Sequence, residues 1–255
     1  MFNKGETDLS RARGVKAQRQ KQHFYEVENT IDFKQPVKKV KQRPIEIVPK
    51  SRGQESLVLA LLDNRVEITI AVGPAGTGKT YLAMQAAIKA LRTGEIEKIV
   101  LTRPAVGVDD EKHGFLPGDI NQKMEPWTRP LLDVLHEYYS PQDVTQMLAD
   151  HIVEISPLAF MRGRTFKASY IIADEMQNAT PGQMKMLLTR IGEGSKIVVT
   201  GDVEQADRSN SNNGLLDIAD RLERNPTGGL KVCKLTSKDT QRHHIINSVL
   251  SLYAD

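Results

Sequence analysis

The stretch "VEITIAVGPAGTGKT", residues 66–80, decides the fold. Its first half is short and rich in β-branched residues, which is typical of a buried strand. Its second half, "GPAGTGKT" (73–80), matches the pattern G-x-x-x-x-G-K-[ST] at every required position. A helical apolar period then runs from Lys79 to about Thr93 and stops at Gly94. A strand, a glycine-rich turn and a helix in this order predict a phosphate-binding loop.

The chemistry of such a loop follows from its backbone. Glycines let the chain curl so that several N–H groups point at one phosphate, and the helix N-terminus adds the positive end of its dipole. We expect Lys79 to contact the β- and γ-phosphates of ATP, and Thr80 to hold Mg²⁺. The residues expected to bind the nucleotide are Gly73, Pro74, Ala75, Gly76, Thr77, Gly78, Lys79, Thr80 and Tyr81.

Two adjacent carboxylates end the apolar run in "YIIADEMQNATPG", residues 170–182. Open parallel sheets place their ligands at the carboxyl ends of the strands. We therefore expect Asp174 to hold the metal, and Glu175 to orient or deprotonate the attacking water. The alternative is the solvated end of a strand, and the phosphate-binding loop favours the site.

A third strand end is followed by the polar residues Thr200, Asp202 and Gln205 in "VVTGDVEQAD", residues 198–207. The amide of Gln205 can donate and accept hydrogen bonds, as a sensor of the γ-phosphate must. The alternative is a plain turn held by Gly201 and Asp202.

Strands and helices alternate along the rest of the chain. Further strands are expected at 97–102, 151–156, 170–174, 196–202 and 230–235, and helices at 55–64, 140–150, 214–223 and from about Asp239. Another helix is expected from Pro181 to about Gly192, with Thr180 and Gln183 as a capping box. This order predicts an α/β fold with a mainly parallel sheet covered on both faces.

Composition limits the function classes. Of 255 residues, 26% are charged, and no apolar run approaches the roughly 18–20 residues that span a bilayer. No membrane association and no secretory leader are expected. The only cysteine, Cys233, is expected to be a buried, inert thiol in a strand, which fits a reducing, cytoplasmic location.

The N-terminal residues 1–45 hold eleven lysines and arginines against five acidic residues. They show no lasting helical or strand period, so we expect a basic and mostly disordered tail. A basic arm for phosphate backbones and a merely solvated tail remain equal alternatives. Residues 46–255 are expected to form one domain.

The motifs together resemble the PhoH family of phosphate-starvation-inducible P-loop ATPases. The resemblance runs from about Pro49 to the mid-240s, and its segments are "GPAGTGKTYLA", "LTRPAV", "GFLPGDINQKMEPWTRPLLD", "EISPLAFMRGRTF", "IIADEMQNATPGQMKMLLTRIG", "VVTGDVEQAD" and "RHHII". It implies a RecA-like three-layer domain, similar to the first motor domain of superfamily 1 helicases and without a PIN nuclease domain. An ATPase that acts on single-stranded RNA or DNA is the implied function.

The resemblance also assigns roles to residues outside the phosphate-binding loop. It implies that Gln54 reads the adenine edge, that Thr102 and Arg103 touch a nucleic-acid backbone, and that Phe115 stacks on a base. A surface-helix role for Gln54 and a packing role for Phe115 are the alternatives. Arg242 stands where the family has an arginine, although its neighbours in "QRHHII" differ from the usual Arg-His-Pro.

Hydrolysis needs the negative charge on the γ-phosphoryl group to be neutralised in the transition state, often by an arginine finger. A single motor domain would take its finger from a neighbouring subunit, in a ring that the resemblance implies is a hexamer. The candidates are Arg162, Arg164, Arg190 and Arg242. Surface ion pairs are the alternative for each.

Two other function classes stay open. A nucleotide-switched binding or regulatory module would keep the same motifs without unwinding nucleic acid. A small-molecule kinase is disfavoured by the paired carboxylates and Gln205.

Overall fold

A computed structural model of the chain describes residues 45–104, 129–206, 212–241, 245–246 and 249. The basic tail apart from Ile45, the base-stacking candidate Phe115 and the arginine Arg242 therefore lie outside the described residues. The expected boundary between tail and domain stays a prediction.

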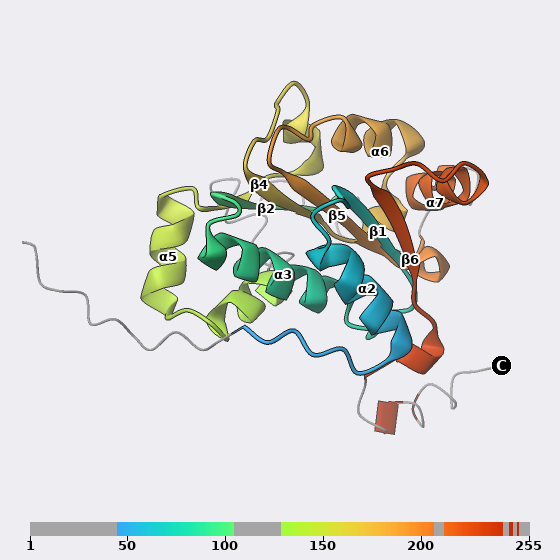
Figure 1. Cartoon of the computed structure of the whole chain (residues 1–255), viewed down its shortest axis with the longest axis horizontal. Coiled ribbons are helices and arrows are strands. Elements are labelled where there is room, and N and C mark those ends of the chain that lie inside the picture. The colour runs from blue at the N-terminus through green and yellow to red at the C-terminus, as the bar shows by residue number, and fades with distance from the viewer. Residues whose placement is uncertain (1–44, 105–128, 207–211, 242–244, 247–248, 250–255) are drawn as a thin grey trace, which may run out of the picture. The chain divides into compact units, whose positions relative to one another are not determined.

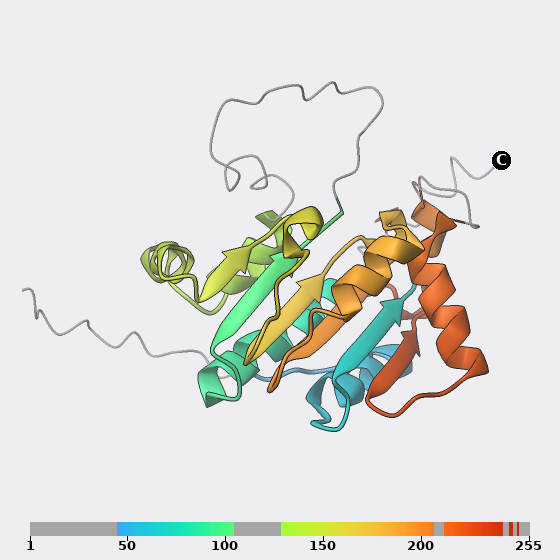
Figure 2. The same ribbon diagram turned by 90° about the horizontal axis from the view of Figure 1, so that it is seen from above.

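Within the described part of the chain, six strands form one sheet in which every pairing is parallel. The strands are β1 (Ile68–Val72), β2 (Lys98–Thr102), β3 (Val153–Ile155), β4 (Ser169–Ala173), β5 (Lys196–Gly201) and β6 (Leu230–Lys234). Their order is β3-β2-β4-β5-β1-β6, so β5 lies between β1 and β4 (Figure 2). The expected α/β fold with a parallel, RecA-like sheet is confirmed.

Helices cover both faces of this sheet (Figure 1). One face carries α2 (Arg52–Leu62), α3 (Lys79–Thr93) and α5 (Pro141–Ala149), and the other carries α6 (Pro181–Leu188) and α7 (Gly214–Arg224). Side chains alternate along the strands between the two layers. In β2, Ile99 and Leu101 pack with the first set of helices and Val100 with the second.

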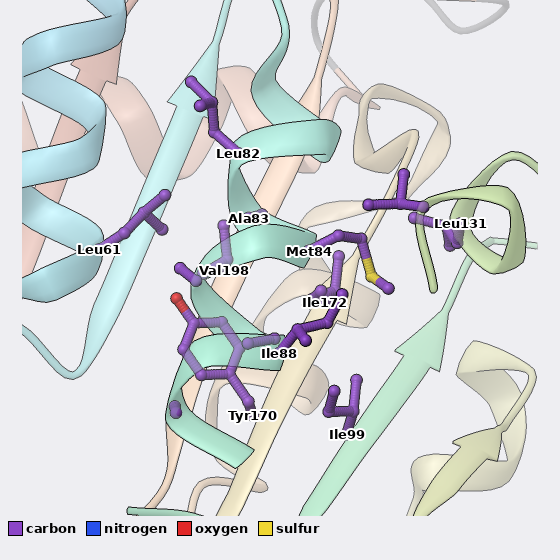
Figure 3. Close-up of a cluster of buried hydrophobic side chains, with 14 of the residues drawn as sticks. Leu61, Leu82, Ala83, Met84, Ile88, Ile99, Leu131, Tyr170, Ile172 and Val198 are labelled. Carbon is purple, nitrogen blue, oxygen red and sulfur yellow. The ribbon is translucent and has the colours of Figure 1, made fainter. Parts of the chain in front are cut away.

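The core under α3 fixes the start of that helix against the sheet. Met84 and Ile88 of α3 pack with Ile99 of β2 and Ile172 of β4, and all four are fully buried (Figure 3). Each such side chain contributes about 1.5–3 kcal/mol relative to an exposed one. The helix that carries Lys79 at its first position is therefore held rigidly.

Most element boundaries agree with the sequence. The capping box of Thr180 and Gln183 is confirmed at the start of α6, although this helix ends at Leu188 instead of near Gly192. Helix α2 begins earlier than its apolar period indicates, because the Ser51 hydroxyl accepts a hydrogen bond from the Gln54 N–H at 3.2 Å.

The helix expected from about Asp239 does not begin at that residue, although helical residues are described further along the chain, at 245–246 and 249. Asp239 instead ends the 3₁₀ turn η5 (Ser237–Asp239). Its carboxylate accepts hydrogen bonds from the N–H of Thr236 at 2.7 Å and of Gly53 at 3.2 Å. These bonds tie the segment after β6 to the start of α2.

Cys233 lies buried in β6, as expected, and burial raises the pKa of its thiol. Among the helices that the structure describes, none combines the length and the apolar character that crossing a bilayer requires.

Candidate active site

A cavity of about 240 Å³ lies at the carboxyl edge of the sheet. It brings together five residues that the sequence singled out from separate segments, namely Lys79, Thr80, Asp174, Glu175 and Gln205. The rest of its lining comes from Ala75, Gly76, Gly78, Tyr81, Gly201 and Asp202. A larger cavity, of about 750 Å³, lies at the opposite edge near Tyr170 and Lys196, away from all of these residues.

The glycine-rich loop needs its glycines for two different reasons. Gly76 and Gly78 have φ angles of 82° and 81°, a left-handed conformation that favours glycine. A side chain on Gly73 would lie 2.5 Å from the carbonyl oxygen of Leu235. Glycine is thus required at Gly76 and Gly78 by the backbone conformation, and at Gly73 by the close approach of Leu235, the residue after β6.

Lys79 is folded against its own loop. Its ammonium donates hydrogen bonds to the carbonyl oxygens of Gly73 at 2.6 Å and Pro74 at 2.8 Å, and the residue is 7% exposed. Helix α3 starts after Gly78 without a side-chain cap. The first N–H groups of a helix have no partner within the helix, so this start is suited to an anion.

One carboxylate oxygen of Asp174 accepts hydrogen bonds from two hydroxyl groups. Its Oδ1 accepts hydrogen bonds from Thr80 at 2.7 Å and from Thr200 at 2.5 Å. The Thr200 bond arises because β5, which carries it, lies between β1 and β4. The sequence marked Thr200 only as a polar residue near a strand end, and its role depends on the strand order.

Glu175 is also held by hydrogen bonds and charge. Its Oε2 accepts a hydrogen bond from Gln177 Nε2 at 2.5 Å, and its Oε1 lies 3.8 Å from Nη2 of Arg103. Its backbone has a φ of 53°, which is unusual for a residue other than glycine. A strained backbone at a paired carboxylate is typical of functional sites.

A chain of hydrogen bonds joins Glu175 to the phosphate-binding loop. Gln177 Oε1 accepts from the N–H of Asp202 at 3.1 Å, and Asp202 Oδ2 accepts from the N–H of Ala75 at 3.0 Å. Gln177 and Asp202 are both buried. Gln177 lies just past the paired carboxylates and Asp202 follows a different strand, and only the fold brings them into line.

The other nucleotide-binding candidates lie in different surroundings. Gln205 is exposed, ends the turn η3 (Val203–Gln205), and makes no side-chain hydrogen bond to another described residue. The hydroxyl of Tyr81 donates to Glu137 at 2.9 Å. Burial, and then this bond, raise the pKa of Tyr81 above its ordinary value.

The side chain of Gln54 makes hydrogen bonds to the backbone of its own chain. Its Nε2 donates to the carbonyl oxygen of Thr77 at 3.0 Å, and its Oε1 accepts from the N–H of Lys50 at 2.8 Å. The side chain is buried rather than on a helix surface. Gln54 thus joins α2 to the phosphate-binding loop, and its adenine role stays a prediction.

Of the strand-binding candidates, Thr102 is buried at 1% exposure, and its hydroxyl has no partner among the described residues. The Thr102 side chain would have to become exposed before it could contact a strand of RNA or DNA. The Arg103 side chain is 29% exposed and reaches Glu175.

The finger candidates differ in their contacts. Arg164 pairs with Glu154 and lies 4.4 Å from the centre of the Phe166 ring. Arg190 donates to the carbonyl oxygen of Arg164 at 3.2 Å. Arg162 is exposed and has no hydrogen bond or ion pair with another described residue.

The sequence of the chain is similar to those of known proteins. The family model described as PhoH-like protein matches residues 46–254. PhoH-like proteins of Bacillus subtilis and Mycobacterium tuberculosis H37Rv are each 44% identical, over 80% and 82% of this chain and 63% and 58% of their own lengths. The chain thus spans about three fifths of these relatives.

Among solved structures, the helicase domain of Pyrococcus furiosus Hef aligns with a TM-score of 0.43 and 12% identity, over 74% of this chain and 38% of that one. This likeness is too weak to extend to function. The family match over 46–254 and the identity to curated relatives are decisive. The chain belongs to the PhoH-like protein family.

Proposed function

We propose that this chain binds ATP with Mg²⁺ and hydrolyses it in the cavity at the carboxyl edge of the sheet. One observation carries the proposal. The Thr80 hydroxyl lies 2.7 Å from the Asp174 carboxylate, and both line the same cavity as Lys79 and Glu175. A phosphate-binding lysine, a pair of oxygen ligands and a second carboxylate in one cavity suit phosphoryl transfer to water.

The oxygens of Thr80 and Asp174 fit Mg²⁺, which takes oxygen ligands and is usually held by one or two carboxylates together with substrate phosphates. These two residues would hold the ion, with Thr200 orienting the carboxylate of Asp174. When bound, Mg²⁺ supplies positive charge to the phosphate oxygens.

The chain's own residues do the rest. The N–H groups of the loop and of the first turn of α3 bind the phosphates. Lys79 exchanges the carbonyl oxygens of Gly73 and Pro74 for phosphate oxygens. Glu175 accepts a proton from the attacking water, and the exposed amide of Gln205 senses the γ-phosphate.

A single strand of RNA or DNA is the proposed partner. Arg103 supports it, because this arginine lies at the end of β2 beside the cavity and its side chain is partly exposed. An arginine in that position can bind a phosphate group with two parallel hydrogen bonds.

The test measures ATP hydrolysis with and without single-stranded RNA and DNA of mixed sequence, alongside the mass of the particle in solution. We expect hydrolysis that depends on Mg²⁺ and rises when one type of strand is added. Hydrolysis that no strand changes, with no strand binding, would favour the nucleotide-switched module over a motor.

We propose that the arginine finger comes from a neighbouring subunit in a ring. Among the described residues that line the cavity, none is an arginine. An arginine finger would therefore reach the γ-phosphoryl group from outside this lining, and a neighbouring subunit in a hexamer supplies it in this proposal.

Replacing Thr200 by Val should weaken Mg²⁺ binding by about 10- to 100-fold, because partners that orient a metal ligand contribute affinities of this size. Valine keeps the shape of the buried side chain and removes the hydroxyl that donates to Asp174. The measurement is the Mg²⁺ concentration that gives half-maximal hydrolysis. The matched control is Thr69→Val, at a buried threonine in the second position of β1, and it should leave this concentration unchanged. An equal shift in both variants would contradict the assignment.

A further inference from the structure

Glu175 is held from two sides by residues of this chain. Gln177 donates to its Oε2 at 2.5 Å, and the Arg103 guanidinium lies 3.8 Å from its Oε1. We propose that Arg103 restrains Glu175 when no RNA or DNA is bound. The phosphate backbone of a bound single strand of RNA or DNA draws Arg103 away and frees the Glu175 carboxylate for the attacking water. This inference rests on the proposed function.

The sheet places the two residues side by side. Strands β2 and β4 pair in parallel with Thr102 opposite Ala173, so the chain leaves both strands at the same edge. The N–H of Asp174 donates to the carbonyl oxygen of Thr102 at 3.0 Å, which fixes the two strand ends to each other. The ion pair thus joins residues just past two strand ends that are hydrogen-bonded to each other.

Only the side chain of Arg103 has to move. Its backbone carbonyl accepts a hydrogen bond from Leu158 at 3.4 Å, which holds the main chain in place. The Arg103 side chain is 29% exposed and that of Glu175 is 35% exposed, so solvent and ligands reach both. A rotation about the side-chain bonds of Arg103 is enough to break the pair.

A phosphate group competes well for this arginine. The contact with Glu175 is a single long ion pair, and partly exposed pairs of this kind are weak. A phosphate accepts two parallel hydrogen bonds from a guanidinium, which is a stronger and more directional arrangement. Binding of a strand at Arg103 and release of Glu175 are therefore linked.

Gln177 acts as the fixed side of this arrangement. Its amide also accepts the N–H of Asp202 at 3.1 Å, and the residue is buried. It keeps one carboxylate oxygen of Glu175 in place while Arg103 releases the other. Gln177 is thus a positioning residue, and Arg103 is the residue that responds to the strand.

The linkage is reciprocal. If a strand raises the population of free Glu175, then a nucleotide state that engages Glu175 raises the affinity for the strand by the same factor. A change in Arg103 should uncouple the two sites without removing either.

The experiment compares wild-type protein with Arg103→Ala in steady-state ATP hydrolysis without any strand and with a saturating single strand. Without a strand, Arg103→Ala should hydrolyse ATP about two- to fivefold faster than the wild type, the range that a partly exposed ion pair covers. The further increase on adding the strand should fall to nearly none. Affinity for a fluorescent, non-hydrolysable ATP analogue should stay within about twofold.

Two further variants sharpen the result. Arg103→Ala combined with Glu175→Gln should lose the increase, since the freed group is Glu175 itself. Arg65→Ala is the control for loss of an arginine in a carboxylate pair, because Arg65 bonds Asp63 at 2.8 Å outside the cavity lining. It should behave as wild type. Thermal unfolding midpoints check that each variant is folded.

The outcomes separate this proposal from the function on which it rests. If the wild type hydrolyses no ATP, both fail. If it hydrolyses ATP and Arg103→Ala leaves the rate without a strand unchanged or lower, Arg103 is a strand contact or a catalytic group, and the restraint is refuted.

Discussion

Glu175→Gln is expected to slow ATP hydrolysis by about 10²- to 10⁴-fold and to leave ATP binding intact. An amide has the shape of the carboxylate and cannot take a proton from water. The amide oxygen can still accept the hydrogen bond that Gln177 donates, so the local structure is kept. The loop, Lys79 and the Thr80–Asp174 pair, which bind the phosphates and the metal in our proposal, are unchanged.

The measurement is phosphate release under single-turnover conditions, together with the affinity for a fluorescent ATP analogue. Glu204→Gln is the matched control, because Glu204 is an exposed carboxylate on the neighbouring turn η3 and does not line the cavity. A hydrolysis rate within tenfold of wild type for Glu175→Gln would assign the water to another group.

Arg162→Ala is expected to slow hydrolysis by about 10³- to 10⁵-fold if this arginine is the finger of a neighbouring subunit. We select it because Arg164 and Arg190 are held in contacts within the chain, with Glu154 and with the carbonyl oxygen of Arg164 respectively. Arg162 directly follows the turn η1 (Leu158–Met161), where Phe160 is 55% exposed. An exposed aromatic residue close to an exposed arginine suits contact with another subunit.

Mixing variants tests the trans arrangement directly. A Glu175→Gln subunit keeps Arg162 and lacks the base, and an Arg162→Ala subunit keeps the base and lacks the finger. Mixed particles should recover activity that neither variant has alone, and wild-type activity per subunit should fall on dilution to monomers. Arg221→Ala, which removes a surface arginine paired with Asp217, is the control.

Arg242, outside the described residues, is the competing finger. The residue before it, Gln241, donates its N–H to the carbonyl oxygen of Gly76 at 2.9 Å, so the chain reaches the phosphate-binding loop at that point. Full activity in Arg162→Ala, with loss in Arg242→Ala that no mixing restores, would place the finger within the same subunit.

Local patterns were sufficient to predict most of the fold. The apolar runs and capping residues predicted the strands and helices, including α3 with both of its ends, because periodicity and caps are properties of neighbouring residues. The start of the C-terminal helix was misplaced at Asp239 for the same reason. The carboxylate of Asp239 bonds Gly53, 186 positions away, and no local pattern carries that information.

Several site residues depended on the fold. Gln54 is bonded to Thr77, since α2 lies against the phosphate-binding loop, and its expected adenine role stays a prediction. Thr102, a candidate contact for nucleic acid, is buried at the end of β2, and that role stays a prediction. Short motifs give residue types, and burial follows from the packing of distant segments.

By itself the sequence determined the parallel α/β fold, the phosphate-binding loop and the carboxylates Asp174 and Glu175, because a strand–loop–helix motif and a strand end are local features. Only the tertiary structure decided that β5 lies between β1 and β4, and thereby that Thr200 bonds Asp174. It also decided that Gln177 and Arg103 hold Glu175 from two sides. These contacts join segments that are remote in the chain, so they arise only from the order in which the strands pair.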